Sequence, residues 1–156
     1  MTFLESSLIR QEYIIRDMQL FSEVKLTRRG LVRYLALSLG LISPNETRTL
    51  LIDIFDALLK AHFASEEPDM NRIMELVNQV REKDLPPAQI KAVRYHIHQL
   101  KEKGLLARKT GRYKFALAPM AEDTDLANAF EYLYLTNTKN AFEKVRKAVG
   151  SLKHMY

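Results

Sequence analysis

Basic side chains, which bind anions, gather in one short part of the chain. Residues 88–114 contain eight lysines and arginines but a single acid, Glu102, so this segment carries a charge of +7. The remaining residues, with sixteen bases and eighteen acids, sum to −2, against +5 for the whole chain. A local excess of this kind is expected of a surface that binds nucleic-acid phosphates. The alternative is a solvated helix face followed by a charged hairpin. The eight bases are Lys91, Arg94, Lys101, Lys103, Arg108, Lys109, Arg112 and Lys114.

Catalytic and metal-binding patterns are scarce by comparison. The sequence contains no cysteine, which excludes disulfide frameworks, cysteine–zinc sites and thiol catalysis. It also lacks a glycine-rich phosphate loop, a His-Glu-x-x-His motif and a nucleophile elbow. His96 and His98 are two positions apart and would face apart on a helix. We therefore expect no enzyme activity, no catalytic residues, no metal site and no cofactor.

Two groups of acidic residues occur outside the basic segment. Asp53 and Asp56 are three positions apart on a predicted helix, where their carboxylates could converge. We interpret them as surface carboxylates, because charged residues are almost always exposed. Three further acids are interpreted as loop and capping residues ahead of the C-terminal helical region: Glu122, Asp123 and Asp125.

The spacing of apolar residues predicts a mainly helical protein. Hydrophobic residues make up 47% of the chain and charged residues 28%, with only five glycines and five prolines to interrupt helices. After Gly104 the apolar period changes from 3.6 to 2, which predicts a hairpin of two short strands around Thr110 and Gly111. The predicted helices cover residues 3–21, 27–42 and 44–62, a shorter segment after Asp69, a segment from Pro87 to about Lys103, and the chain beyond Pro119.

Capping residues support several of these boundaries. Thr27 is a plausible N-cap, and Gly40 lies near the end of the helix that it would open. Ser43, followed by Pro44 and then Glu46, has the pattern of a capping box, so a helix is expected to begin there. Gly104 stands where a left-handed residue would end the helix before the hairpin.

Residues 93–113, VRYHIHQLKEKGLLARKTGRY, resemble the recognition helix and wing of prokaryotic winged-helix transcriptional regulators. The resemblance is close over about 86–117 and looser over 44–117. It implies a winged helix-turn-helix domain of three helices and a β-hairpin wing. Two features depart from the family: the link over residues 81–87 is longer than a tight turn, and the helix begins Pro-Pro-Ala-Gln without the usual Ser or Thr. The family pattern Val-x-x-His-[Leu/Ile]-x-x-Leu-x-x-x-Gly-Leu-[Leu/Ile/Val] is carried here by Val93, His96, Ile97, Leu100, Gly104, Leu105 and Leu106.

The resemblance implies double-stranded DNA binding by a transcriptional regulator. At 100° per residue, Ile90, Val93, Ile97 and Leu100 would face the core and leave a polar face free for the major groove. The alternative is a non-catalytic winged-helix module that binds another protein in a larger assembly. His96 is expected to be structural. The candidate DNA-binding residues are Gln89, Lys91, Arg94, Tyr95, His98, Gln99, Arg108, Lys109, Arg112 and Lys114.

The flanking regions complete the predicted organisation. Residues 1–43 form an N-terminal helical extension, 44–118 the winged-helix domain and 119–156 a C-terminal helical arm. No apolar run approaches the ~20 residues of a membrane-spanning helix, and no signal peptide is evident, so we expect a cytoplasmic protein without membrane contact. The arm either pairs with its copy in a homodimer or packs back on its own chain. Its apolar residues fall at heptad-like spacing, at Phe142, Val145, Val149, Leu152 and Tyr156, and are preceded by Leu126, Phe130 and Leu133.

Overall fold

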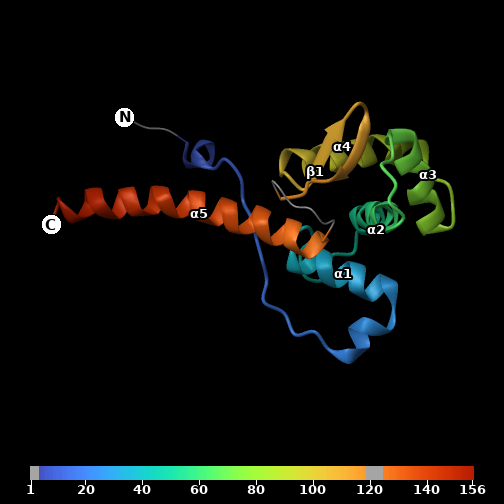
Figure 1. Ribbon diagram of the computed structural model, residues 1–156, viewed down its shortest axis with the longest axis horizontal. Coiled ribbons are helices and arrows are strands. Elements are labelled where there is room, and N and C mark those ends of the chain that lie inside the picture. Colours follow the sequence, from blue (N-terminus) through green and yellow to red (C-terminus); the bar gives the residue numbers. More distant parts are fainter. Residues whose placement is uncertain (1–3, 119–124) are drawn as a thin grey trace. The chain divides into compact units, whose positions relative to one another are not determined.

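The structure is a computed structural model that describes residues 4–118 and 125–156. Over these residues the protein is mainly helical, with five α-helices and one antiparallel sheet of two strands, as the sequence predicts (Figure 1). The chain divides into two compact units, residues 1–116 and 117–156, which are described separately below.

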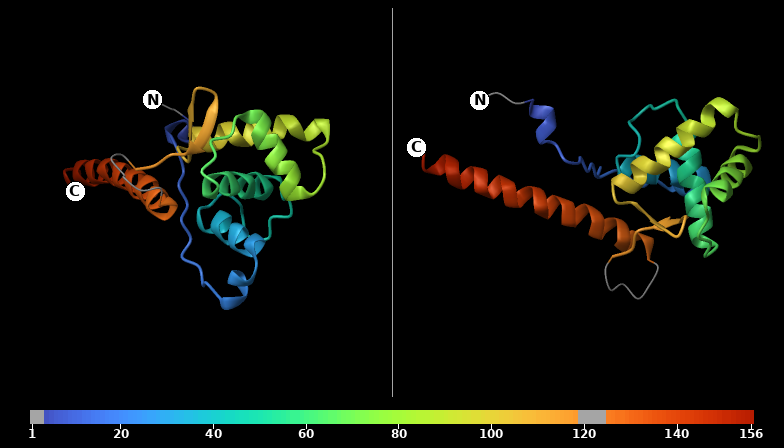
Figure 2. Two further views of the ribbon diagram at one scale, coloured as in Figure 1. Left: turned by 45° about the vertical axis from the view of Figure 1, so that its right-hand side comes forward. Right: turned by 90° about the horizontal axis from the view of Figure 1, so that it is seen from above.

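The first unit is built around one central helix. After two 3₁₀ helices, η1 (Glu5–Leu8) and η2 (Ser22–Leu26), come α1 (Arg28–Ser38), α2 (Leu50–Phe63), α3 (Met70–Arg81), α4 (Pro87–Glu102), β1 (Leu106–Lys109) and β2 (Arg112–Phe115). Helix α2 contacts α1, α3, α4 and β2 (Figure 2). Nine of its fourteen residues are buried, because neighbours cover it on several sides.

The core joins the central helix to the helices and the hairpin around it. Ile54 and Phe55 of α2 are fully buried, together with Val77 of α3 and Val93 of α4. The Phe55 ring meets the edge of the Phe115 ring at 6.1 Å between centroids, a favourable arrangement that fastens β2 to α2.

Helix α4 presents the predicted face to the core with one exception. Val93, Ile97 and Leu100 are buried, and the Ile97 residue is only 1% exposed to solvent. Ile90, which the period also assigns to this face, is 37% exposed. Ile90 is therefore covered less completely than the three later residues of this face.

The predicted hairpin is confirmed. Leu106 pairs with Phe115 and Lys109 with Arg112, so the two-residue turn is Thr110-Gly111. Both turn residues have positive φ, 55° and 77°, as a two-residue hairpin loop requires. Gly104, which follows the C-cap residue of α4, has a positive φ of 91°. This confirms its predicted role as the left-handed residue that ends the helix.

Helix α2 begins six residues later than the capping-box pattern predicts. Residues 44–49 are a turn and a loop, and the helix starts at Leu50. Asn45 takes a left-handed conformation with φ of 62°, and the Glu46 carboxylate pairs with Arg48 at 3.2 Å instead of reaching back to Ser43. No residue between Pro44 and Leu50 is apolar, so a helix there would bury nothing to offset its cost.

The predicted helix over residues 3–21 is wrong. Among the described residues of this segment only Glu5–Leu8 are helical, as a short 3₁₀ turn, and residues 9–21 form neither helix nor strand. Leu8 and Ile15, two residues of the predicted apolar stripe, remain 61% and 64% exposed. Residues 9–21, which we call the strap, instead lie along the rest of the first unit. Contacts with distant residues therefore override the local helical period.

Polar anchors hold this strap to the end of α1. The Arg16 guanidinium donates to the carbonyl oxygens of Leu37 at 2.7 Å and of Ile42, beyond the helix, at 3.0 Å. The backbone N–H of Arg16 donates to the carbonyl oxygen of Ser38, the last residue of α1, at 2.8 Å. Ile14 passes so close to Gly40 that a β-carbon at Gly40 would lie 2.6 Å from the Ile14 Cβ. Gly40 also has φ of 70°, so both space and conformation require glycine there.

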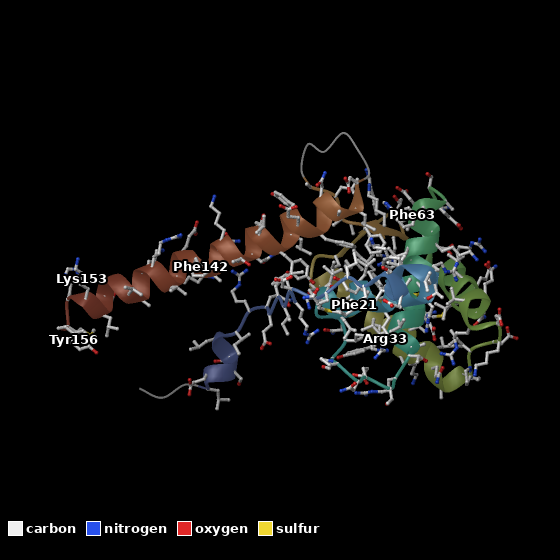
Figure 3. The ribbon with its side chains drawn as sticks, turned by 90° about the horizontal axis from the view of Figure 1, so that it is seen from below. Phe21, Arg33, Phe63, Phe142, Lys153 and Tyr156 are labelled. Atoms are coloured by element: carbon white, nitrogen blue, oxygen red, sulfur yellow. The ribbon has the colours of Figure 1, made fainter. Side chains whose placement is uncertain are left out.

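The second unit contains one long helix, α5 (Leu126–Lys153). The Asp125 carboxylate accepts from the backbone N–H of Ala127 at 2.9 Å, which confirms its predicted capping role. The other two acids of that prediction, Glu122 and Asp123, lie outside the described residues. All five apolar residues of the heptad-like stripe are exposed, namely Phe142, Val145, Val149, Leu152 and Tyr156. Figure 3 labels the first and the last of them, Phe142 and Tyr156.

The inward face of α4 can be tested by placing a charge on it. Ile97→Asp would bury an unpaired carboxylate, and we expect a loss of about 3–5 kcal/mol in the free energy of unfolding. His98→Asp places the same group one residue further, on an exposed position, and should leave the unfolding transition nearly unchanged. Chemical denaturation followed by circular dichroism measures both. Equal stability of the two variants would show that the face is wrongly assigned.

Candidate nucleic-acid interface

The predicted polar face of α4 is exposed. Five of its six candidate residues point away from the core, and Tyr95 is 60% exposed although its ring is large. The helical period explains this, because burial of Val93, Ile97 and Leu100 turns the positions between them outward. The five exposed residues are Lys91, Arg94, Tyr95, His98 and Gln99.

Gln89 does not belong to this face. It is half-buried and lines a cavity with Ala92 and His96, along the flank of α4 between its buried and exposed faces. Counting 100° per residue from Lys91 shows why, since a step of two positions turns the side chain by about 200°. Its place on the flank sets Gln89 apart from the other five candidates of α4, and its contact with a base stays a prediction.

One acid lies near the end of the exposed face. The Nε2 atom of His98 is 3.9 Å from the Glu102 carboxylate, one helical turn away. Both side chains are more than half exposed, so solvent screens this pair strongly. Lys91 and Arg94 lie more than two turns before Glu102, whereas Lys101, which is also exposed, lies next to it and seven positions after Arg94.

The hairpin places its four predicted bases on two faces. By the strand register, Lys109, Arg112 and Lys114 share one face, whereas Arg108 lies opposite Tyr113 on the other. The Arg108 guanidinium carbon is 5.8 Å from the centre of the Tyr113 ring, a cation–π contact. The four bases therefore form no single row, as the alternation of a strand requires.

An acidic residue from the loop before α3 meets two of these bases. Arg112 donates to the Glu67 carbonyl oxygen at 3.0 Å, and the Lys114 ammonium lies 4.0 Å from the Glu67 carboxylate. The loop is held there by the backbone, because the N–H of Tyr113 donates to the Pro68 carbonyl at 2.9 Å. Sequence reasoning missed this contact, since the two segments are some 45 residues apart. Lys109, at the turn, is exposed beyond this acid.

Lys103, one of the eight clustered bases, contributes less to the surface than its charge suggests. It is half-buried, and burial lowers the pKa of its ammonium, a shift that nearby Glu12 partly opposes. The strap covers this end of α4: the Tyr13 hydroxyl donates to the Lys103 carbonyl, and the Lys103 ammonium lies 5.7 Å from the Tyr13 ring centre. Burial also raises the pKa of the Tyr13 phenol.

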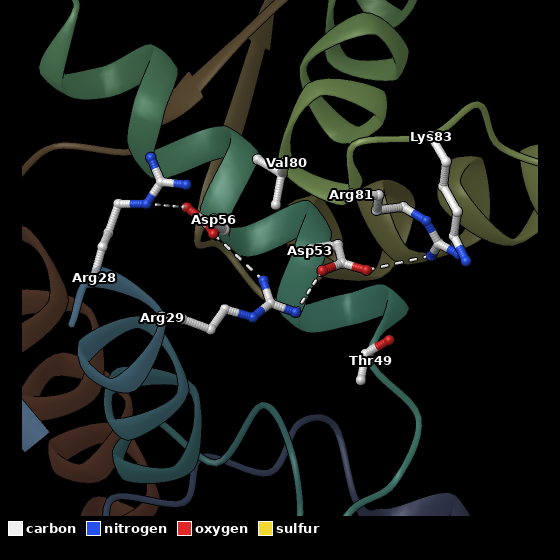
Figure 4. Close-up of a pocket in the computed structure, with 8 residues that line it drawn as sticks. All are labelled: Arg28, Arg29, Thr49, Asp53, Asp56, Val80, Arg81 and Lys83. Atoms are coloured by element: carbon white, nitrogen blue, oxygen red, sulfur yellow. Dashed lines mark hydrogen bonds and ion pairs between the residues drawn. The ribbon is translucent and has the colours of Figure 1, made fainter.

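Asp53 and Asp56 are buried, which corrects their interpretation as surface carboxylates. They are only 5% and 2% exposed and lie on the side of α2 that faces α1 and α3 (Figure 4). Arg29 bridges both carboxylates, reaching Asp56 at 3.3 Å, and Arg81 reaches Asp53 at 3.2 Å. Arg28 approaches Asp56 at 3.5 Å. We call these five residues the arginine–aspartate cluster.

The sequence does contain a signal for this cluster. Both acids interrupt an otherwise apolar helical run, LLIDIFDALL, which covers every side of the helix with apolar groups. A helix that is apolar all round is buried, so acids within it need partners of opposite charge. Arg28 and Arg29 at the start of the preceding helix, and Arg81 at the end of the following one, supply them.

Other kinds of site are not found in the described part of the chain. Within residues 4–118 and 125–156, no three histidine, aspartate or glutamate side chains are grouped so that they could hold a metal ion. No helix among these residues combines the length and apolar character needed to cross a membrane. Comparisons with protein-family models, with curated proteins and with solved structures gave no match to this chain.

Removal of one carboxylate tests how much the arginine–aspartate cluster contributes to the stability of the first unit. Asp53→Ala removes the bridge between α1 and α3 and leaves the largely buried Arg81 guanidinium without its carboxylate, so we expect a loss of about 3–5 kcal/mol in unfolding free energy. Glu75→Ala is a matched control, because Glu75 also pairs with an arginine, Arg72, but is exposed. That variant should unfold almost as the parent does. If thermal and chemical denaturation show Asp53→Ala to be as stable as Glu75→Ala, the cluster does not hold the three helices together.

Proposed function

We propose that this protein binds double-stranded DNA and acts as a transcriptional regulator of the winged helix-turn-helix type. The observation that carries the proposal is the exposed polar face of α4, which presents Lys91, Arg94, Tyr95, His98 and Gln99. The opposite side of the same helix is anchored in the core by Val93 and Ile97. A rigidly held helix with such a face suits the major groove, which is about 12 Å wide and admits an α-helix.

The order of the elements supports the winged-helix assignment. Helices α2, α3 and α4 are followed at once by the β1–β2 hairpin, as in a three-helix domain with a wing. The backbone bond from Tyr113 to Pro68 places the segment between α2 and α3 beside β2, in the manner of a minimal third strand. The hairpin is thereby fastened at its base, and its turn is left exposed.

Different residues would have different tasks on DNA. Lys91 and Arg94 have the donors that guanine edges or phosphates accept, and Gln99 has the paired donor and acceptor that adenine requires. Tyr95 and His98 would donate to phosphate oxygens. On the hairpin, Lys109 is the base best placed for phosphate, because Glu67 offsets the charge of Lys114 and holds Arg112.

Substitution on α4 tests the helix as the reading element. Changing Lys91 and Arg94 together to alanine should cost about 1–3 kcal/mol in binding free energy for each good base contact, on preferred sequences only. Preferred sequences would first be selected from a random duplex pool, and affinities measured by fluorescence anisotropy. Lys25→Ala removes an exposed base of η2 that lies away from α4 and should bind as the parent does.

Substitution on the hairpin tests phosphate contact separately. Lys109→Ala should weaken binding to all duplexes alike and reduce the slope of log affinity against log salt by about one unit. Lys114→Ala should change the slope less, because Glu67 already partly neutralises that ammonium. A Lys114 effect as large as that of Lys109 would contradict the role given to Glu67.

The second candidate is a module that binds another protein. Ile90 and Tyr95 support it, since both put apolar surface on the exposed part of α4. Duplex binding that is absent even at low salt, in the parent as in every variant, would favour this candidate over DNA binding.

We also propose that two copies of the chain pair through α5. Its exposed stripe repeats at 3.5 residues, the period of a coiled coil rather than of a single helix. Lys139, Arg146 and Lys153 flank the stripe at intervals of seven residues. An antiparallel pair would set these bases against each other, whereas a parallel pair would set them across from Ala141 and Ala148. Charge therefore favours the parallel pair, in which two α4 helices would serve two half-sites.

Removal of the stripe tests the pairing. Truncation after Asn137 should convert a dimer into a folded monomer in sedimentation velocity, and Val149→Asp should do the same in the full chain. Asn140→Asp adds the same charge on the far side of α5 from the stripe and should leave the dimer intact. A parent chain that is monomeric at tens of micromolar, or a truncated chain that stays dimeric, would contradict the proposal.

A further inference from the structure

A cavity of about 480 Å³ lies beside the arginine–aspartate cluster, between α1, the start of α2 and the end of α3. All five cluster residues line it, and Thr49, Val80 and Lys83 complete its wall among the described residues (Figure 4). Cavities that bind small molecules typically measure about 300–1,000 Å³, so this one has room for such a ligand. No residue of the exposed α4 face or of the hairpin belongs to the described wall.

The described wall of this cavity carries a net positive charge. It contains four bases and two acids, so its charge is +2. Glu82 and Asp84, the chain neighbours of Lys83, are not part of it. Both carboxylates already have arginine partners, and the excess positive charge therefore remains for a ligand. The four bases are Arg28, Arg29, Arg81 and Lys83.

Three side chains of the wall have donors that the cluster does not use. The Arg28 guanidinium approaches Asp56 at 3.5 Å through Nε and makes no hydrogen bond with a described residue. The Lys83 ammonium has no ion pair or hydrogen bond among the described residues, and its side chain converges with that of Arg81 (Figure 4). Like charges that converge repel each other, so an anion between them would lower the electrostatic energy. Thr49 is the N-cap residue of α2, but its side chain makes no capping hydrogen bond.

These features fit a phosphate monoester. Such a group carries a charge of about −1.5 to −2 at pH 7 and has three strong acceptor oxygens. Arginine binds phosphate oxygens through paired N–H donors, and lysine binds them as a point charge. Val80 provides the one apolar side chain of the described wall, so a ligand with a large carbon body would have little apolar surface to contact. A phosphate of the DNA backbone carries a single negative charge, and the charge of +2 therefore favours a monoester over a diester.

We propose that this cavity binds a phosphate monoester. Arg28 and Lys83 contact the phosphate oxygens, and the Thr49 hydroxyl donates to one of them. Arg29 and Arg81, which the buried carboxylates hold in place, supply the remaining positive charge. The site is separate from the proposed DNA interface, because none of the candidate DNA-binding residues lines the cavity.

Titration of the full chain with methyl phosphate, followed by NMR of backbone and arginine side-chain N–H groups, tests the site. Sodium chloride keeps the ionic strength constant, so that screening of exposed charges does not change. We expect saturable shifts at the Arg28 side chain and at residues 49–52, with a dissociation constant of about 1 mM. Dimethyl phosphate has the same tetrahedral centre but one negative charge, as in DNA, and should bind about fivefold more weakly.

Matched substitutions locate the contact. Lys83→Ala removes an exposed ammonium and should weaken methyl phosphate binding about fivefold. Lys101→Ala makes the same change at an exposed position of α4 outside the wall and should have no effect. Arg28→Ala should weaken binding as Lys83→Ala does, and Asp56 keeps its partner Arg29 in that variant.

The outcomes separate a free phosphate monoester from the DNA backbone. Shifts that are absent, that do not saturate or that map away from the wall would overturn the proposal. So would equal binding of dimethyl phosphate, or equal loss in Lys83→Ala and Lys101→Ala. On duplexes, Lys83→Ala should bind as Lys25→Ala does, and a larger loss would assign the cavity to a backbone phosphate instead. The methyl phosphate titration needs no duplex, so this proposal and DNA binding can fail separately.

Discussion

Two buried carboxylates on the central helix organise the first unit. Asp53 and Asp56 lie where α2 is covered by α1 and α3, and guanidinium groups from both neighbours, Arg29 and Arg81, reach them. An ion pair removed from water gains little net stability, but it penalises any arrangement that separates the partners. The cluster therefore selects one orientation of the three helices, and the apolar contacts of Ile54, Phe55 and Val77 supply most of the favourable free energy.

The exposed face of α4 depends on that arrangement. Helix α4 packs on α2 and α3 through Val93, Ile97 and Leu100, and the β1–β2 hairpin is fastened to α2 by the rings of Phe55 and Phe115. The two elements proposed to contact DNA, α4 and the β1–β2 hairpin, therefore both pack on α2. A shift of α2 would move them together.

The surplus positive charge of the chain is distributed less simply than its concentration in residues 88–114 suggests. Glu67 lies beside Arg112 and Lys114, and the strap partly buries Lys103. The bases exposed beyond these contacts are Lys91 and Arg94 in the first half of α4, Lys101 near its end, and Arg108 and Lys109 on the hairpin.

Local chemistry in the sequence determined α3, α4, the hairpin turn and the caps at Thr27, Asp69 and Asp125, because each depends on residues a few positions apart. It also determined the five exposed residues of α4, since the helical period places them opposite the buried ones. Only the tertiary structure decided that residues 9–21 form no helix and that Asp53 and Asp56 are buried. Both depend on partners distant in the chain, such as Leu37 for Arg16 and Arg81 for Asp53, and local periodicity carries no information about which distant groups will meet.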